Sequence, residues 1–421
     1  AEHCRGRPAL LVLIHGVYGS SLDYVLLSSV IRERMARMGA DEVQIGPSVS
    51  TFQLRGVPLL SVLIARSNEG RTTEGIEPLG RLLAKEVAET AERLSCRHAL
   101  YIVGHSLGGL VARYAAAELI ASGKLGSGPD ATLAPLGYLS ICSPHLGVRK
   151  PGGTFAKATW RTLVHTLLSK QYGLTGKQLG LMDGTDAQVP LIQRMSDPDL
   201  PFMRALAAFR HRTLLSTWSG DLSVPYATSV AQVCRPPWLV EEGATPTATP
   251  RRTVDTPLGA PSHSPSAAAG SGTPPPHEVT YAPWQRRSRH WVVLHAEGFA
   301  KGSEDADGSL DAASSAAAAT AAIPASAPHP APAPAPAVAS PVSEGMVVDW
   351  RRELECPSAL VRGINSVQWR RLVIHVPAVT HLGKVFVHTF TIGKHQLFDQ
   401  GQRAFSEALS ELLLRDVGVC A

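Results

Sequence analysis

Residues 99–117 read ALYIVGHSLGGLVARYAAA, and this stretch decides the fold. Its first five residues are apolar and indicate a buried strand, while the residues from Leu110 onward are typical of a helix. The pattern Gly-x-Ser-x-Gly lies between them, and Gly104 and Gly108 leave room for a turn too tight for a Cβ. This sequence of strand, sharp turn and helix predicts that the Ser106 hydroxyl projects above a sheet, where a base could make it a nucleophile.

Strand and helix patterns alternate along the first 237 residues. Apolar runs at 10–14, 43–45, 136–142 and 213–218 predict strands, and helical spacing of apolar residues predicts a helix over 76–94. Strands separated by helices imply right-handed crossovers and a mostly parallel sheet with helices on both faces. The fold class is therefore α/β.

The composition changes sharply after about Trp238. Residues 238–345 are rich in alanine, proline, serine, threonine and glycine, so this stretch cannot bury enough apolar area to offset its ordering entropy. We interpret it as a long disordered insert. One island, residues 281–299, carries aromatic and basic side chains. It favours a single edge strand or docked loop, and a short binding motif is the alternative.

Ordered patterns return near residue 346. Residues 369–376 and 384–388 are predicted to be strands, and 396–414 an amphipathic helix. The simplest organisation is one α/β domain whose two parts, 1–237 and 346–421, are separated by the insert.

Composition excludes several function classes. The net charge of +5 is small and the arginines are spread along the chain, so the sequence shows no basic cluster of the kind that binds nucleic acids. The six cysteines show no paired or zinc-binding spacing, so neither a metal nor a cofactor is expected, and their usage suits a reducing, intracellular setting. No apolar run reaches the ~20 residues that span a bilayer. The chain begins without methionine, directly before a strand, and resembles an excised segment.

A serine nucleophile needs a histidine base and an acid that orients the base. Asp221 is the predicted acid, because it follows the strand that ends near Trp218. Its competitors, Asp183 and Asp186, lie in a polar loop with no strand before them. A turn or helix-cap role is the structural alternative for Asp221.

The predicted base is His381, in the loop that follows the strand 369–376. His388 is the alternative, although the pattern places it inside the next predicted strand. His145 comes too early in the order serine, acid, histidine that α/β-hydrolases follow.

The oxyanion of the reaction needs two backbone N–H donors. One is assigned to Leu107, where the helix begins and its dipole favours negative charge. The other is assigned to Val17, with Tyr18 as the alternative, in the turn after the first core strand.

Several segments in the same order resemble the lipase-like serine esterases, a branch of the α/β-hydrolases. They are 13–19 (LIHGVYG), 73–83, 103–114, 143–147 (SPHLG), 175–179, 190–195, 221–229 and 362–369, followed by His381. The resemblance implies an α/β-hydrolase fold with a helical cap at about 150–200. It also implies Ser106 as nucleophile, Asp221 as acid and His381 as base.

The implied reaction is hydrolysis of an acyl ester, with a lipid or acylglycerol as substrate and peripheral contact with a lipid surface. Trp160, Leu163 and Leu167 share one face of the predicted cap, which is either packed on its own core or a mobile lid. Two alternatives stay open. One is an inactive scaffold or binding protein with this fold, and the other is a thioesterase or acyltransferase that uses the same triad.

Overall fold

A computed structural model gives the three-dimensional arrangement of the chain. It describes residues 7–94, 96–128, 130–148, 170–218, 221, 223–232, 292–297, 357–376, 383–393 and 399–419. Within these residues one sheet of nine strands forms the centre, in the order β2-β3-β4-β1-β5-β6-β7-β9-β8. The strands are β1 (Ala9–Ile14), β2 (Asp41–Gln44), β3 (Val49–Leu54), β4 (Val57–Ile64), β5 (His98–His105), β6 (Leu133–Ile141), β7 (His211–Thr217), β8 (Val292–Glu297) and β9 (Arg370–His375).

The middle of the sheet is parallel and its two edges are antiparallel. Strands β4, β1, β5, β6, β7 and β9 pair in parallel in that order. Antiparallel pairs join β2 to β3, β3 to β4, and β8 to β9. This is the α/β-hydrolase arrangement that the sequence predicted.

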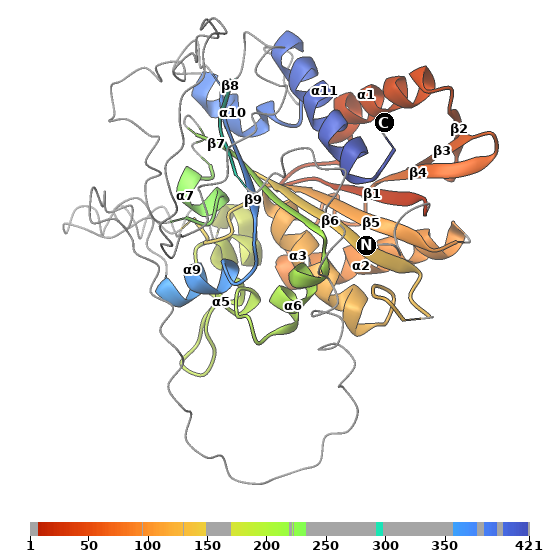
Figure 1. Ribbon diagram of the computed structural model, residues 1–421. Coiled ribbons are helices and arrows are strands. Elements are labelled where there is room, and N and C mark those ends of the chain that lie inside the picture. Colours follow the sequence, from red (N-terminus) through yellow and green to blue (C-terminus); the bar gives the residue numbers. More distant parts are fainter. Residues whose placement is uncertain are drawn as a thin grey trace, which may run out of the picture.

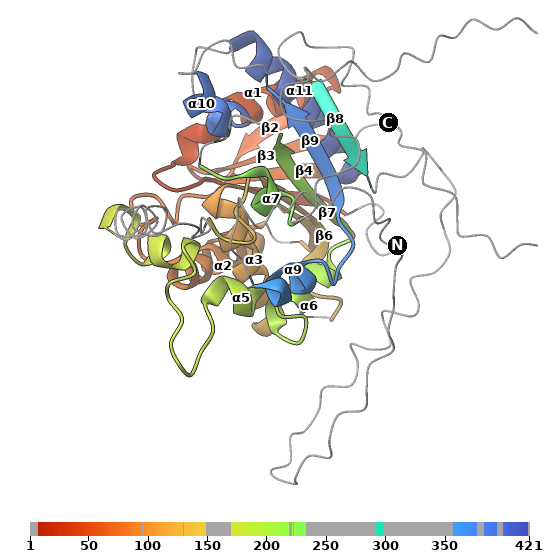
Figure 2. The same cartoon turned by 90° about the vertical axis from the view of Figure 1, so that its left-hand side faces the viewer.

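Helices cover both faces of the sheet (Figures 1 and 2). One face carries α1 (Val25–Arg37), α10 (Gly383–Phe390) and α11 (Asp399–Asp416). The other carries α2 (Ile76–Arg93), α3 (Leu107–Ala121), α5 (Leu191–Met195), α6 (Pro201–Ala208) and α9 (Ser358–Ile364). Two short helices, the 3₁₀ turn η2 (Ser21–Tyr24) and α7 (Tyr226–Ser229), follow β1 and β7.

Two apolar clusters, one on each face, hold the helices to the sheet. The first joins α2 and α3 to alternate residues of β1 and β5, and the second joins α1 and α11 to the residues between them. Every residue of β1 and β5 is therefore buried. Polar contacts add to the second cluster, because Asp416 of α11 accepts hydrogen bonds from Tyr101 on β5 (2.8 Å) and Arg370 on β9 (2.9 Å).

Most predicted elements are confirmed, with boundaries shifted by a few residues. The edge-strand interpretation of the island 281–299 is confirmed over six of its residues, which form β8 at the end of the sheet. The remainder of the insert 238–345, and the cap residues 151–169 that include Trp160, Leu163 and Leu167, lie outside the described residues.

One prediction is wrong. Residues 384–388 are not a strand, because they belong to helix α10. The run Val385-Phe386-Val387 looks like a strand by composition, but Val387 and Phe390 are buried three residues apart, which is helical spacing. The hairpin of β3 and β4 was not predicted either. Among the described helices, none is long and apolar enough to cross a bilayer.

Candidate active site

Side chains with catalytic chemistry follow the carboxyl ends of four neighbouring parallel strands. His15 follows β1, Cys142 follows β6, and Asp221 lies just beyond β7. Ser106 stands between β5 and α3. Because these strands run in parallel, their carboxyl ends meet at one edge of the sheet, which is where α/β folds place their ligands.

Ser106 sits on a strained turn. Its φ of +54° and ψ of −122° are unusual for a residue with a side chain. Neighbouring glycines make the turn possible, since a Cβ at Gly104 would lie 2.5 Å from the backbone of Gly108. A Cβ at Gly108 would in turn lie 2.5 Å from the Ile14 carbonyl oxygen. The Ser106 N–H donates to the Ile141 carbonyl at 2.8 Å, which ties the turn to β6.

The loop after β1 approaches the serine closely. A Cβ at Gly16 would lie 3.0 Å from the Ser106 Cβ, so glycine permits this approach. The Tyr18 N–H donates to Thr72 Oγ1 at 3.0 Å. In the described part of the chain no hydrogen bond from the Val17 or Leu107 N–H is recorded. Of the two candidates in this loop, Val17 is thus the one whose N–H is not already engaged.

A short helix covers the same loop. Residues 170–179 are helical, and the Tyr18 hydroxyl donates to the Gln171 carbonyl. The rings of Tyr18 and Tyr172 lie 5.4 Å apart. This segment belongs to the predicted cap, and its contacts place the described part of that cap over the loop between β1 and η2.

Asp221 and His388 form a buried hydrogen-bonded pair. His388 Nδ1 donates to Asp221 Oδ2 at 2.6 Å, and the two side chains are 12% and 3% exposed. The other carboxylate oxygen accepts the N–H groups of Ser223 and Val224 at 2.9 and 2.8 Å. The carboxylate is thus held by its own loop and presents one oxygen to the imidazole. This is the acid–histidine relation that a serine hydrolase needs.

His388 also lies against the nucleophile turn. His105 Nε2 donates to the His388 carbonyl oxygen at 2.9 Å, and the two rings lie 4.8 Å apart. His105 precedes Ser106, so the contact joins helix α10 directly to the turn that carries the serine. His381, the histidine predicted from the sequence, lies outside the described residues. Among the described residues, the structure brings the alternative, His388, to the predicted acid.

Cys142 completes the surroundings of the pair. It ends β6 with φ +49° and is 1% exposed. Its sulfur, a carboxylate oxygen of Asp221 and a ring nitrogen of His388 all lie within 4.8 Å of one another. Burial raises the pKa of the Cys142 thiol well above its usual value, and the charge of Asp221 adds to the rise. The thiol is therefore neutral at physiological pH.

The competing acids and the early histidine have structural roles or lie on the surface. His145 is fully buried, with Nε2 2.7 Å from the Ser140 hydroxyl, and burial holds its pKa well below the usual value. Asp183 accepts the Leu191 N–H at 3.0 Å at the start of α5, and Asp186 is exposed. No described contact joins any of them to Ser106.

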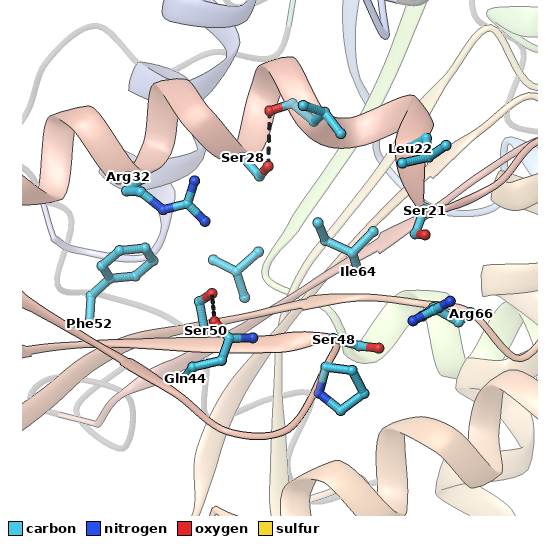
Figure 3. Close-up of a pocket in the computed structure, with 13 residues that line it drawn as sticks. Ser21, Leu22, Ser28, Arg32, Gln44, Ser48, Ser50, Phe52, Ile64 and Arg66 are labelled. Atoms are coloured by element: carbon cyan, nitrogen blue, oxygen red, sulfur yellow. Dashed lines mark hydrogen bonds between the residues drawn. The ribbon is translucent and has the colours of Figure 1, made fainter.

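A pocket of about 210 Å³ lies elsewhere, between α1 and the strands β3 and β4 (Figure 3). Phe52, Val62 and Ile64 supply apolar surface, and Arg32 and Arg66 stand at opposite ends. It begins at η2, directly after the loop that approaches Ser106, but neither Ser106 nor the Asp221–His388 pair lines it. We place the chemistry at the serine because, among the described residues, only this region combines a nucleophile on a strained turn with an acid–histidine pair nearby.

The chain is similar to known proteins. A family model described as "Putative serine esterase (DUF676)" matches residues 7–235, more than half of the chain. The "Putative lipase C4A8.10" of Schizosaccharomyces pombe is 28% identical over 172 residues. The "Putative lipase ROG1" of Saccharomyces cerevisiae is 29% identical over 165 residues. Each match covers 39% of this chain but only 21% and 22% of those relatives.

The chain is also similar to solved structures. The mature lipase BlEst2 of Bacillus licheniformis is 12% identical with a TM-score of 0.29, and the match covers 54% of this chain and 71% of that one. An extracellular α/β-hydrolase from a Paenibacillus species is 14% identical with a TM-score of 0.27, covering 53% and 82%.

Proposed function

Since the chain belongs to the family described as "Putative serine esterase", we propose that it hydrolyses carboxylic esters through an acyl-enzyme on Ser106. The single observation that carries this proposal is the 2.6 Å hydrogen bond between His388 and Asp221 beside the turn of Ser106. A histidine oriented by a buried carboxylate, next to a serine on a strained turn, is the arrangement that activates a hydroxyl.

In the proposed first step His388 Nε2 takes the proton of Ser106 as the serine oxygen attacks the ester carbonyl carbon. Asp221 holds Nδ1–H, which fixes the tautomer and leaves Nε2 free to act as base. The N–H groups of Val17 and Leu107 stabilise the oxyanion. The alcohol then leaves with the proton from His388, and water attacks the acyl-enzyme by the same route, which releases the acid and restores Ser106.

The assignment of the base differs from the one that the sequence favoured. Support for His388 comes from its bond to Asp221 and from the bond between its carbonyl and His105. The first contact orients the imidazole, and the second joins the His388 backbone to the residue that precedes Ser106. We therefore assign the triad Ser106, Asp221 and His388 and treat His381 as the competing base.

We propose a lipid or another long-chain acyl ester as the substrate. The relatives named as lipases support this class. Large apolar side chains are exposed around the loop that approaches the serine, with Tyr18 56%, Leu22 75% and Val25 55% exposed. Apolar surface of this kind favours contact with an acyl chain or a lipid surface.

Labelling of the purified chain with a fluorophosphonate probe tests the activated serine. The wild type should incorporate one probe per chain, and Ser106→Ala should incorporate none. Hydrolysis of p-nitrophenyl esters of increasing chain length then tests the substrate class, and we expect kcat/KM to rise from short to long acyl chains. A matched thioester series separates ester from thioester hydrolysis.

The variant Ser122→Ala is the control for Ser106→Ala. Within the described residues its hydroxyl bonds only to the Leu119 carbonyl in the last turn of α3, so its labelling should match the wild type. A well-folded wild-type chain that takes up no probe would contradict the proposed hydrolase and favour a scaffold with this fold.

A further inference from the structure

Three different metal-ligating groups converge behind the proposed catalytic histidine. Cys142 Sγ, a carboxylate oxygen of Asp221 and a ring nitrogen of His388 lie within 4.8 Å of one another. They come from the end of β6, the loop after β7 and helix α10, three segments that the fold fixes independently. The proposed hydrolysis uses the carboxylate and the imidazole but gives the thiol no role.

The spacing is close to that of a zinc site. Tetrahedral zinc binds sulfur at about 2.3 Å and nitrogen or oxygen at about 2.0–2.2 Å, which sets the ligand atoms roughly 3.4–3.6 Å apart. The present N···O distance is 2.6 Å. To reach the zinc geometry this distance would open by about 0.8 Å, and the distances to sulfur would close by at most about 1.4 Å.

Two buried threonine hydroxyls beside the sulfur add a second observation. Thr217 and Thr391 interact with the Cys142 thiol and favour its ionised form. Their hydroxyl oxygens are buried, and within the described residues neither has a partner other than this sulfur. Both hydroxyls can therefore donate to a thiolate, which a metal ion would create there.

We propose that Cys142, Asp221 and His388 form a binding site for Zn²⁺, and that the ion inhibits the esterase. Binding displaces the thiol proton to solvent and shifts the His388 proton from Nδ1 to Nε2, so that one proton is released and Nε2 can no longer accept the proton of Ser106. The hydrogen bond that orients the histidine is then lost. The inhibition rests on the proposed function, but the binding does not. Zinc has no part in the ester hydrolysis itself.

Cobalt substitution and zinc titration of the full-length, metal-free chain test the site. Co²⁺ should give a thiolate-to-cobalt charge-transfer band, and Zn²⁺ should abolish that band at one ion per chain. Competition with a chromophoric chelator measures the zinc affinity. In Cys142→Ser the band should disappear and the affinity should fall at least tenfold.

Cys96 provides the matched control. Its sulfur lies 3.7 Å from His98 Nδ1, so it also pairs a thiol with an imidazole, and it is exposed. Cys96→Ser should keep the band and the affinity. If Cys142→Ser retains both, or if the wild type binds no Zn²⁺, the proposed site is wrong.

A further variant covers the case in which Cys142→Ser does not fold. His388→Gln should keep a cobalt–thiolate band and lose at least tenfold in zinc affinity, and an unchanged affinity would overturn the site. Fluorophosphonate labelling of the metal-free chain tests the hydrolase separately. A chain that binds Zn²⁺ but takes up no probe would refute the esterase and leave the site. A chain that takes up probe but binds no Zn²⁺ would refute the zinc site and leave the esterase.

Discussion

The nucleophile half of the candidate site and its acid–base half are built in different ways. The nucleophile half is local: β5, the turn at Ser106 and α3 follow one another within residues 98–121. The acid–base half joins two residues, Asp221 and His388, that are 167 positions apart in the sequence. One half is encoded by a short motif, and the other exists only once β7, β9 and α10 have packed.

This difference predicts different vulnerabilities. Steric exclusion fixes the nucleophile turn, because backbone atoms occupy the space where side chains at Gly104 and Gly108 would lie. Hydrogen bonds between remote segments fix the acid–base pair, and the loss of one partner leaves the other buried without its bond. Substitution of Gly104 or Gly108 should therefore destabilise the fold strongly, while substitution of Asp221 or His388 should impair the chemistry more than the fold.

Asp221→Asn should have the largest effect and should break the acid–base half alone. The amide cannot hold His388 in the required tautomer, so kcat/KM for an ester should fall by about 10³–10⁴-fold. The thermal midpoint should change little, since the asparagine carbonyl still accepts from the loop N–H groups. Asp186→Asn is the control, because Asp186 is exposed, and it should retain wild-type kcat/KM. A fall of less than tenfold in Asp221→Asn would remove Asp221 from the mechanism.

Gly104→Ala should disrupt the nucleophile half by lowering the stability of the fold. The new Cβ would lie 2.5 Å from backbone atoms of Gly108 and Gly109, so we expect a loss of at least about 3 kcal/mol in the free energy of unfolding. Urea denaturation followed by circular dichroism measures this loss. Gly126→Ala should change stability by less than about 0.5 kcal/mol, because nothing lies within 4 Å of its Cβ position. Equal effects in the two variants would refute the steric account.

A smaller effect on stability is expected from β7, the strand that precedes Asp221. β7 begins at His211, whose pKa burial lowers to about 4. The unfolded chain binds a proton near pH 6.5 that the folded chain binds only near pH 4, so stability should fall as pH decreases through this window. We expect about 1–3 kcal/mol from this residue. His211→Gln should flatten the decline between pH 7 and pH 4 in urea denaturation. An identical pH dependence would exclude His211 as its source.

The same contrast explains which features could be predicted from the sequence. Ser106 and its flanking strand and helix are apparent in consecutive residues. Asp221 could be assigned because an acid after a strand in a parallel sheet reaches the shared edge. The hairpin of β3 and β4 was not predicted, because polar residues such as Ser50 and Gln53 interrupt the apolar pattern of β3. The apolar run of β4 was an available strand signal.

The position of His388 could not be predicted, because it depends on the secondary structure of a short apolar run. Val385-Phe386-Val387 suits a strand by propensity, and runs of this length do not distinguish a strand from a helix by period alone. Packing of Val387 and Phe390 against the second apolar cluster makes the segment helical. That helix turns His388 toward Asp221. The spacing of three between the apolar residues Val387 and Phe390 was the one sequence signal that favoured a helix.

The proposed mechanism depends on His388 as the base that activates Ser106. The rate of fluorophosphonate labelling in His388→Ala and His381→Ala tests this role, with circular dichroism of both variants to establish that they fold. We expect His388→Ala to label at least about 1,000-fold more slowly than the wild type, while His381→Ala stays within about threefold. Slow labelling in His381→Ala and a wild-type rate in His388→Ala would contradict it.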